Sequence, residues 1–138
     1  MATITDVNNQ IRTMLAASPI PVYWPNEYVT PPDEPTAFTV PVLHKVDSGI
    51  ASFGGGRGNN RWRRTHMLEC VVMVPVNTGM DQALVYAEQL AAIFRSQRPT
   101  DDISFFDAHV DPEFSVDSDN GNYWRLSALT DVSFDQIG

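Results

Sequence analysis

The chain has 138 residues, 43% of them hydrophobic and 19% charged, and its 17 acidic residues outnumber its 9 basic ones, for a net charge of -8. This length predicts a single domain over residues 1–138 with one hydrophobic core. The single cysteine, Cys70, excludes an intramolecular disulfide, and the negative charge excludes nucleic-acid binding over the whole surface. With no apolar run near the roughly 18 residues of a membrane span and no signal-peptide pattern, we expect a soluble, cytosolic protein with no membrane partner.

The first predicted element is an amphipathic helix over residues 4–15, in which apolar side chains recur at helical spacing. Thr3 with Asp6 resembles a capping box, and Pro19 ends the helix because the residue before a proline avoids the α region. Residues 19–41 hold seven of the ten prolines. We therefore expect an extended connector there, with one short edge strand over residues 20–24.

A long β-hairpin follows, with strands over residues 36–46 and 62–76. The even-numbered residues of both strands are mostly apolar and are predicted to face the core: Phe38, Val40, Val42 and Val46 in the first, and Leu68, Cys70, Val72, Val74 and Val76 in the second. The loop between them, residues 48–60, contains five of the eight glycines. Ordering such a loop costs roughly 1–2 kcal/mol per residue, so we expect a flexible tip that a partner holds in place.

The second half of the chain repeats the order of helix and then strands. A helix is predicted over residues 80–96, with Thr78 and Asp81 as its start signal and Pro99 closing it. Strands are predicted over residues 103–110, 114–116 and 123–134, with Asn120-Gly121 as a hairpin turn. The predicted fold class is α+β: an antiparallel-rich mixed sheet with two helices packed on one face and a long β-hairpin with a flexible Gly-rich tip.

The C-terminal third is rich in carboxylates, which could act in pairs as acid and base or bind a hard cation. Their spacing matches no calcium loop, and the three histidines lie on three predicted strands without a zinc-binding spacing. Cys70 lies on an apolar strand face, which favours a core residue over a nucleophile. We therefore predict no catalytic residue, no metal and no cofactor. A small hydrolase would need a pocket with converging carboxylates.

The strongest local anomaly in charge is a run of four arginines within eight positions, Arg57, Arg61, Arg63 and Arg64, interleaved with Trp62. Such a run can bind an acidic protein surface, including a second copy of this chain. It can also bind phosphates while Trp62 stacks on a base, or simply form a solvated edge. The candidate interface residues are these five and Phe53, on the glycine-rich tip.

Two further stretches carry a resemblance to a known family. Residues 21–27, Pro-Val-Tyr-Trp-Pro-Asn-Glu, precede Thr30-Pro31-Pro32 and Pro35, and residues 72–79 lead into an alanine-rich helix ending at Arg95. These stretches resemble the two halves of bacteriophage tail terminator (tail completion) proteins, over most of residues 1–135.

The resemblance implies a structural virion protein rather than an enzyme. Members of that family form a hexameric ring on the last ring of the tail tube, end tube polymerisation and join the head connector. It implies as partners other copies of the chain, the tail tube protein and a head-tail connector or head completion protein. It also implies DNA passing through the bore without specific binding, and a place in the virion tail or neck after synthesis in the host bacterial cytoplasm. From the excess of acidic residues, we expect that those facing the bore keep DNA from sticking to it. The alternatives are another neck or tail component, such as a head completion or tube protein, and a small nucleic-acid-binding module.

Overall fold

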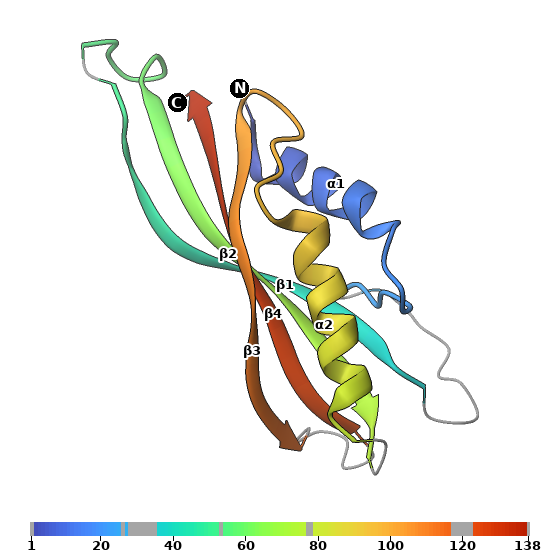
Figure 1. Ribbon diagram of the computed structural model, residues 1–138. Coiled ribbons are helices and arrows are strands. Elements are labelled where there is room, and N and C mark those ends of the chain that lie inside the picture. Colours follow the sequence, from blue (N-terminus) through green and yellow to red (C-terminus); the bar gives the residue numbers. More distant parts are fainter. Residues whose placement is uncertain are drawn as a thin grey trace.

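The computed structural model describes residues 2–25, 27, 36–52, 54–76, 79–116 and 123–137. The chain order is α1 (Ile4–Leu15), β1 (Phe38–Ile50), β2 (Arg61–Pro75), α2 (Asp81–Phe94), β3 (Ile103–Val116) and β4 (Tyr123–Ile137). The four strands form one sheet in the order β1-β2-β4-β3 (Figure 1). Every pair of neighbouring strands is antiparallel, so the predicted α+β class is confirmed, with a purely antiparallel sheet in place of a mixed one.

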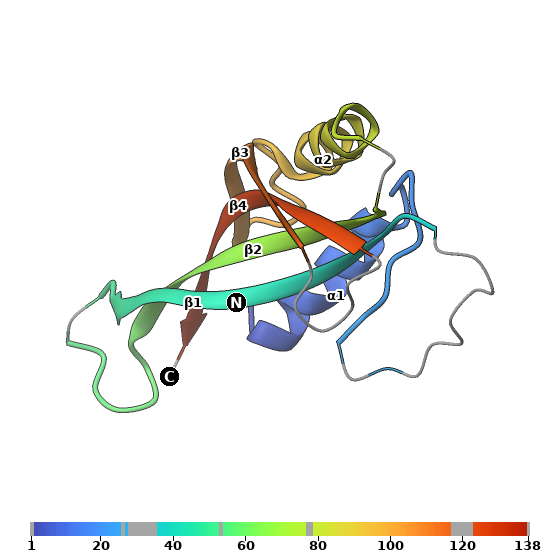
Figure 2. The same cartoon turned by 90° about the horizontal axis from the view of Figure 1, so that it is seen from below.

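Both helices pack on the same face of the sheet, as predicted (Figure 2). One cluster of buried residues joins them to it. The helices contribute Val7, Ile11 and Leu15 of α1 and Ala83, Ala87, Leu90, Ala91 and Phe94 of α2 to this cluster. The two central strands contribute even-numbered residues, which are Leu68, Cys70, Val72 and Val74 of β2 and Leu126, Ala128, Val132 and Phe134 of β4. This alternation follows from the pleat of a strand, which turns every second side chain to the same face. The opposite face is covered by neither α1 nor α2, and we call it the open face.

The two helices begin and end through different backbone and side-chain interactions. In α1 the Thr3 hydroxyl accepts a hydrogen bond from the Asp6 backbone, and the Asp6 carboxylate accepts one from the Thr3 backbone, so the predicted capping box is confirmed. In α2 the predicted range of residues 80–96 is confirmed to within two residues, as Asp81–Phe94, with Asp81 in the first turn. Met80 is the N-cap, without a side-chain cap bond, and the backbone leaves the helix at Arg95, well before Pro99. Thr78 and Asn120-Gly121 lie outside the described residues.

The strands are longer than the sequence predicts. β1 continues to Ile50, so the glycine-rich connection is shorter than residues 48–60, and the two predicted strands at 103–110 and 114–116 form one strand, β3. β3 stays paired through two irregularities in its register with β4. The cooperative pairing of neighbouring strands carries β1 through Gly49 and β3 through Pro112, which sequence patterns read as breaks.

The predicted buried face of β1 is wrong. Thr39 and Pro41, at odd positions, are buried and lie opposite Val72 and Cys70 on the helix-covered face. The even-numbered valines lie on the open face, and Val46, at a register shift, is 58% exposed. Phe38, Val40 and Val42 are therefore on the face opposite α1 and α2, whereas Leu43 packs against the core. The predicted strand over residues 20–24 is reduced to one parallel bridge between Val22 and Thr39.

Candidate interaction surface

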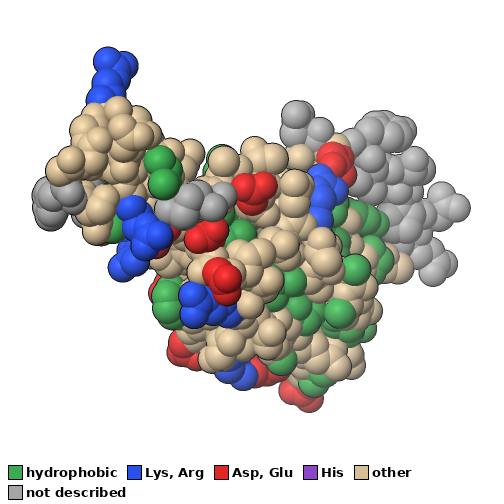
Figure 3. Space-filling model, turned by 90° about the horizontal axis from the view of Figure 1, so that it is seen from above, with side chains coloured by type: hydrophobic (Ala, Val, Ile, Leu, Met, Phe, Trp, Pro, Cys, Tyr) green, Lys and Arg blue, Asp and Glu red, His purple; other side chains and the backbone are tan. Residues whose placement is uncertain are grey.

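The β1–β2 hairpin forms an arm that extends beyond the helices, and the space-filling view shows basic side chains at its end and its base (Figures 1 and 3). Its tip is folded by its own hydrogen bonds: the Asn60 side chain donates to the Gly56 carbonyl and accepts from the Gly55 backbone. A Cβ at Gly55 would lie 2.7 Å from the Asn59 carbonyl oxygen, so only glycine fits there. Arg57 is exposed on this tip, and it has no ion pair among the described residues. Phe53 lies outside them.

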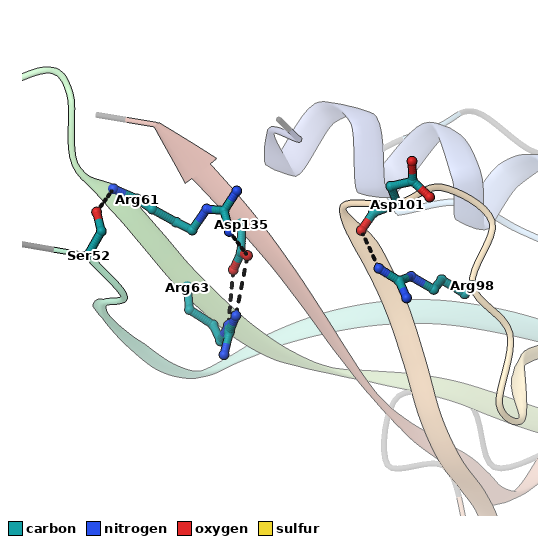
Figure 4. A network of polar contacts seen from close by, with 6 residues as sticks. All are labelled: Ser52, Arg61, Arg63, Arg98, Asp101 and Asp135. Atoms are coloured by element: carbon teal, nitrogen blue, oxygen red, sulfur yellow. Dashed lines mark hydrogen bonds and ion pairs between the residues drawn. The ribbon is translucent and has the colours of Figure 1, made fainter.

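The predicted arginine cluster does not form one patch, because alternate residues of β2 point to opposite faces. Arg61 and Arg63 lie on the open face and both reach Asp135 of β4 (Figure 4). The Arg63 guanidinium donates to both carboxylate oxygens, at 3.0 and 3.3 Å, and these contacts raise the pKa of Arg63. One carboxylate is thus shared between these two arginines and partly balances their charge within the chain.

Arg64 and Trp62 lie on the other face of β2. The Arg64 guanidinium donates to the Ser48 hydroxyl and lies 5.6 Å from the centre of the Trp62 ring. Lys45 pairs across the strands with His66, and Ser48 pairs with Arg64. These residues line a groove of about 310 Å³ whose other walls are Ile4 of α1 and Phe134 and Gln136 of β4. We call it the basic groove, because Lys45, Arg64 and His66 line it without a carboxylate.

The sequence reading missed Lys45, Ser48 and His66, since they lie outside the run of arginines. A correctly registered hairpin would have placed them beside Arg64. It also missed Asp135, which is distant in the chain and is brought to Arg61 and Arg63 by the pairing of β2 with β4.

The pKa of His66 reflects the electrostatic environment of the groove. Its pKa is lowered by burial first, and then by the positive charges of Arg64 and Lys45. Its Nδ1 atom is buried without a hydrogen-bond partner within the described structure, and the ring stacks on Phe134. The groove thus disfavours an additional positive charge.

This shift predicts a pH dependence of stability. The unfolded chain binds a proton at His66 before the folded chain does, so lowering the pH from about 7.5 to about 5 should destabilise the wild type more than His66→Gln. Urea unfolding at several pH values, at low protein concentration, measures the difference. His109→Gln, at an exposed position on β3, is the control. Parallel pH curves for wild type and His66→Gln would contradict the prediction.

The open face carries a second polar cluster, centred on Glu69 of β2. Its carboxylate accepts a hydrogen bond from the Ser127 hydroxyl at 2.6 Å, lies 3.1 Å from His44 Nε2 and 3.9 Å from Arg125. It therefore joins β1, β2 and β4 through side chains. Around it lie the apolar residues of the open face, Phe38, Val40, Val42, Val71, Met73 and Leu129.

The two outer edges of the sheet differ. Residues after α2 cover part of β3, because Ser96 donates to the Phe106 carbonyl and Phe105 donates to the Gln97 carbonyl. The outer edge of β1 is bridged by the connector at Thr39, and along residues 40–50 no described strand pairs with it. Pro41 and the register shift between Lys45 and Asp47 interrupt this edge, as they do on natural edge strands.

The residues considered for catalysis do not assemble into a reaction centre. Cys70 is buried and burial raises its pKa to about 12, so the thiol is protonated at neutral pH. Among the described residues, no three His, Cys, Asp or Glu side chains are placed to hold a metal ion. Asp117 and Asp119, two of the carboxylates in the C-terminal third, lie outside the described residues.

Neither helix in the described part of the chain has the length and apolar character to cross a membrane. No protein-family model and no curated protein matches the sequence. One solved structure, of a protein known by a sequence identifier that states no function, has 14% sequence identity and a TM-score of 0.55. The match covers 95% of this chain and 90% of that one, so this likeness extends over nearly the whole fold. At this identity it shows a shared fold and no more.

Proposed function

We propose that this chain is a structural protein of a bacteriophage tail or neck, which forms a ring on the end of the tail tube. The ring ends tube polymerisation and provides the joint to the head connector. The proposal begins from the sequence resemblance to tail terminator proteins. The observation that carries it further is the β1–β2 arm, which extends from the packed body (Figure 1) and has exposed Arg57 in its connecting loop.

An arm of this kind suits contact between subunits. A closed ring requires two different surfaces on each subunit, joined head to tail. The arm supplies one of these two surfaces, at one end of the sheet, and the packed body of the molecule supplies the other. The open edge of β1 runs along the same arm and adds backbone donors and acceptors for a neighbouring chain.

Negative-stain microscopy of the purified protein, alone and with the tube protein of the same phage, tests this function. We expect closed rings and capped tubes of limited length. A variant in which Asn-Gly replaces residues 52–60 shortens the arm and joins Ala51 to Arg61, which pair across the strands, by a two-residue hairpin turn. It should keep the wild-type circular dichroism spectrum and form no rings, whereas Arg98→Ala, at an exposed site near β3, should assemble normally.

Other outcomes would reject the proposal in different ways. Open tubes formed by this chain alone would identify a tube protein. A single particle at every concentration, with no effect on tube growth, would exclude a tail role. Salt-sensitive binding of duplex DNA by the isolated chain would favour the nucleic-acid-binding alternative.

A further inference from the structure

The two faces of the hairpin arm differ in how their charges are balanced. On the open face, Arg61 and Arg63 share Asp135. On the helix side, Lys45 lies directly opposite His66, and Arg64 is the next basic residue along β2 on the same face. Lys45 and Arg64 are thus diagonal neighbours whose long side chains reach towards one another, and the repulsion between their like charges costs stability in the isolated chain. A ligand of negative charge would remove that cost.

The groove has free donors for such a ligand. Lys45 is exposed, and neither a carboxylate nor another acceptor contacts its ammonium group in the described structure. Arg64 donates to the neutral Ser48 hydroxyl, which leaves its charge unpaired by any described acid. Ile4, 46% exposed, lies at the wall of the groove, and Val46, beside Lys45, is exposed as well. The groove therefore offers cations next to apolar surface, which is the usual composition of a protein contact.

A complementary surface is present on α2 of the same chain. Asp81, Val85 and Glu88 lie four and three residues apart, so they share one face of the helix. All three are exposed, Val85 by 48%, and neither carboxylate has an ion-pair partner among the described residues. Asp81 and Glu88 are separated by about 10 Å of rise along the helix axis, with the apolar Val85 between them.

We propose that the basic groove, formed by Lys45, Ser48, Arg64 and His66, binds the Asp81 and Glu88 carboxylates on α2 of a second copy of this chain. α2 begins beyond Pro75, at the end of β2 opposite the arm. The two surfaces are different and lie towards opposite ends of the sheet, so the contact is head to tail. Such contacts repeat from subunit to subunit and close into rings when the rotation permits. This inference rests on the proposed ring function and names the contact that holds the ring together.

A charge-swap experiment tests the contact. The groove variant carries Lys45→Glu and Arg64→Glu, and the helix variant carries Asp81→Lys and Glu88→Lys. Each should weaken self-association, measured by sedimentation velocity over a range of concentrations, by about tenfold or more. The chain that carries all four substitutions should recover association, because both charges of each pair are exchanged. Control substitutions Asp101→Lys and Asp131→Lys change the net charge as the helix variant does and should leave the contact intact.

Thermal unfolding of each variant separates loss of contact from loss of fold. If the groove variant does not fold, self-association of the helix variant, which is changed only at exposed positions, and of the milder Lys45→Gln still tests the contact. The inference is overturned if the groove variant or the helix variant forms rings as the wild type does, or if the chain with all four substitutions associates no better than these two variants. Either result would leave the ring function standing. A wild type that never associates would overturn both. Duplex DNA bound through Lys45 and Arg64, with self-association unaffected by their reversal, would assign the groove to phosphate instead.

Discussion

Replacing Phe94 by alanine is expected to lower the free energy of unfolding by about 3–5 kcal/mol. Phe94 ends α2, is almost fully buried, and packs against Phe105 of β3 with ring centroids 5.3 Å apart. Alanine would leave a cavity between the helix and the sheet and would remove the ring contact with Phe105. Because domains of this size are stable by only about 5–15 kcal/mol, this one substitution would remove much of the total.

Urea denaturation followed by circular dichroism measures this loss. Val85→Ala is the matched control, because Val85 is on the same helix and exposed, and its effect should stay within about 0.5 kcal/mol. Equal denaturation midpoints for Phe94→Ala and Val85→Ala would show that α2 does not hold the sheet in the way described.

The second large effect is expected at Glu69. Its side chain is only 21% exposed and accepts from Ser127 while lying close to His44 and Arg125. Glu69→Ala should cost about 1.5–3 kcal/mol, because hydrogen bonds to charged groups are stronger than neutral ones and three polar groups lose their partner. The loss reflects a cluster that joins three strands on a face without a helix.

Chemical denaturation of Glu69→Ala and Glu69→Gln distinguishes the roles of shape and charge. Glutamine keeps an acceptor for the Ser127 hydroxyl but gives up the charge, so it should recover part of the loss. Asp131→Ala, at an exposed position of β4, is the control and should be nearly neutral. A stability of Glu69→Ala equal to wild type would show that the cluster contributes nothing to the open face.

The differences between the predicted and observed structures share a physical cause. Local patterns predicted the helices and strands because helical spacing and strand alternation are properties of a few neighbouring residues. β1 shows the limit of that reasoning. Its even-numbered valines were assigned to the core, yet Thr39 and Pro41 face the helices. An alternating strand has two faces, and the position of its neighbours decides which of them is covered.

The candidate interface shows the same limit. Arg61, Trp62, Arg63 and Arg64 are adjacent in sequence, but the strand pleat sends Arg61 and Arg63 to Asp135 and leaves Arg64 with Lys45 and His66. Nothing within a short window of residues relates Asp135 to Arg63, because that pair forms only when β4 aligns with β2.

By itself, the sequence determined the α+β class, the order of the elements, the capping box of α1 and the long hairpin, since each depends on interactions between near neighbours. The strand order β1-β2-β4-β3, the covered face of β1, the Glu69 cluster and the basic groove were decided by the tertiary structure. They depend on register between strands distant in the chain, and a shift of one residue would turn every one of these side chains to the other face.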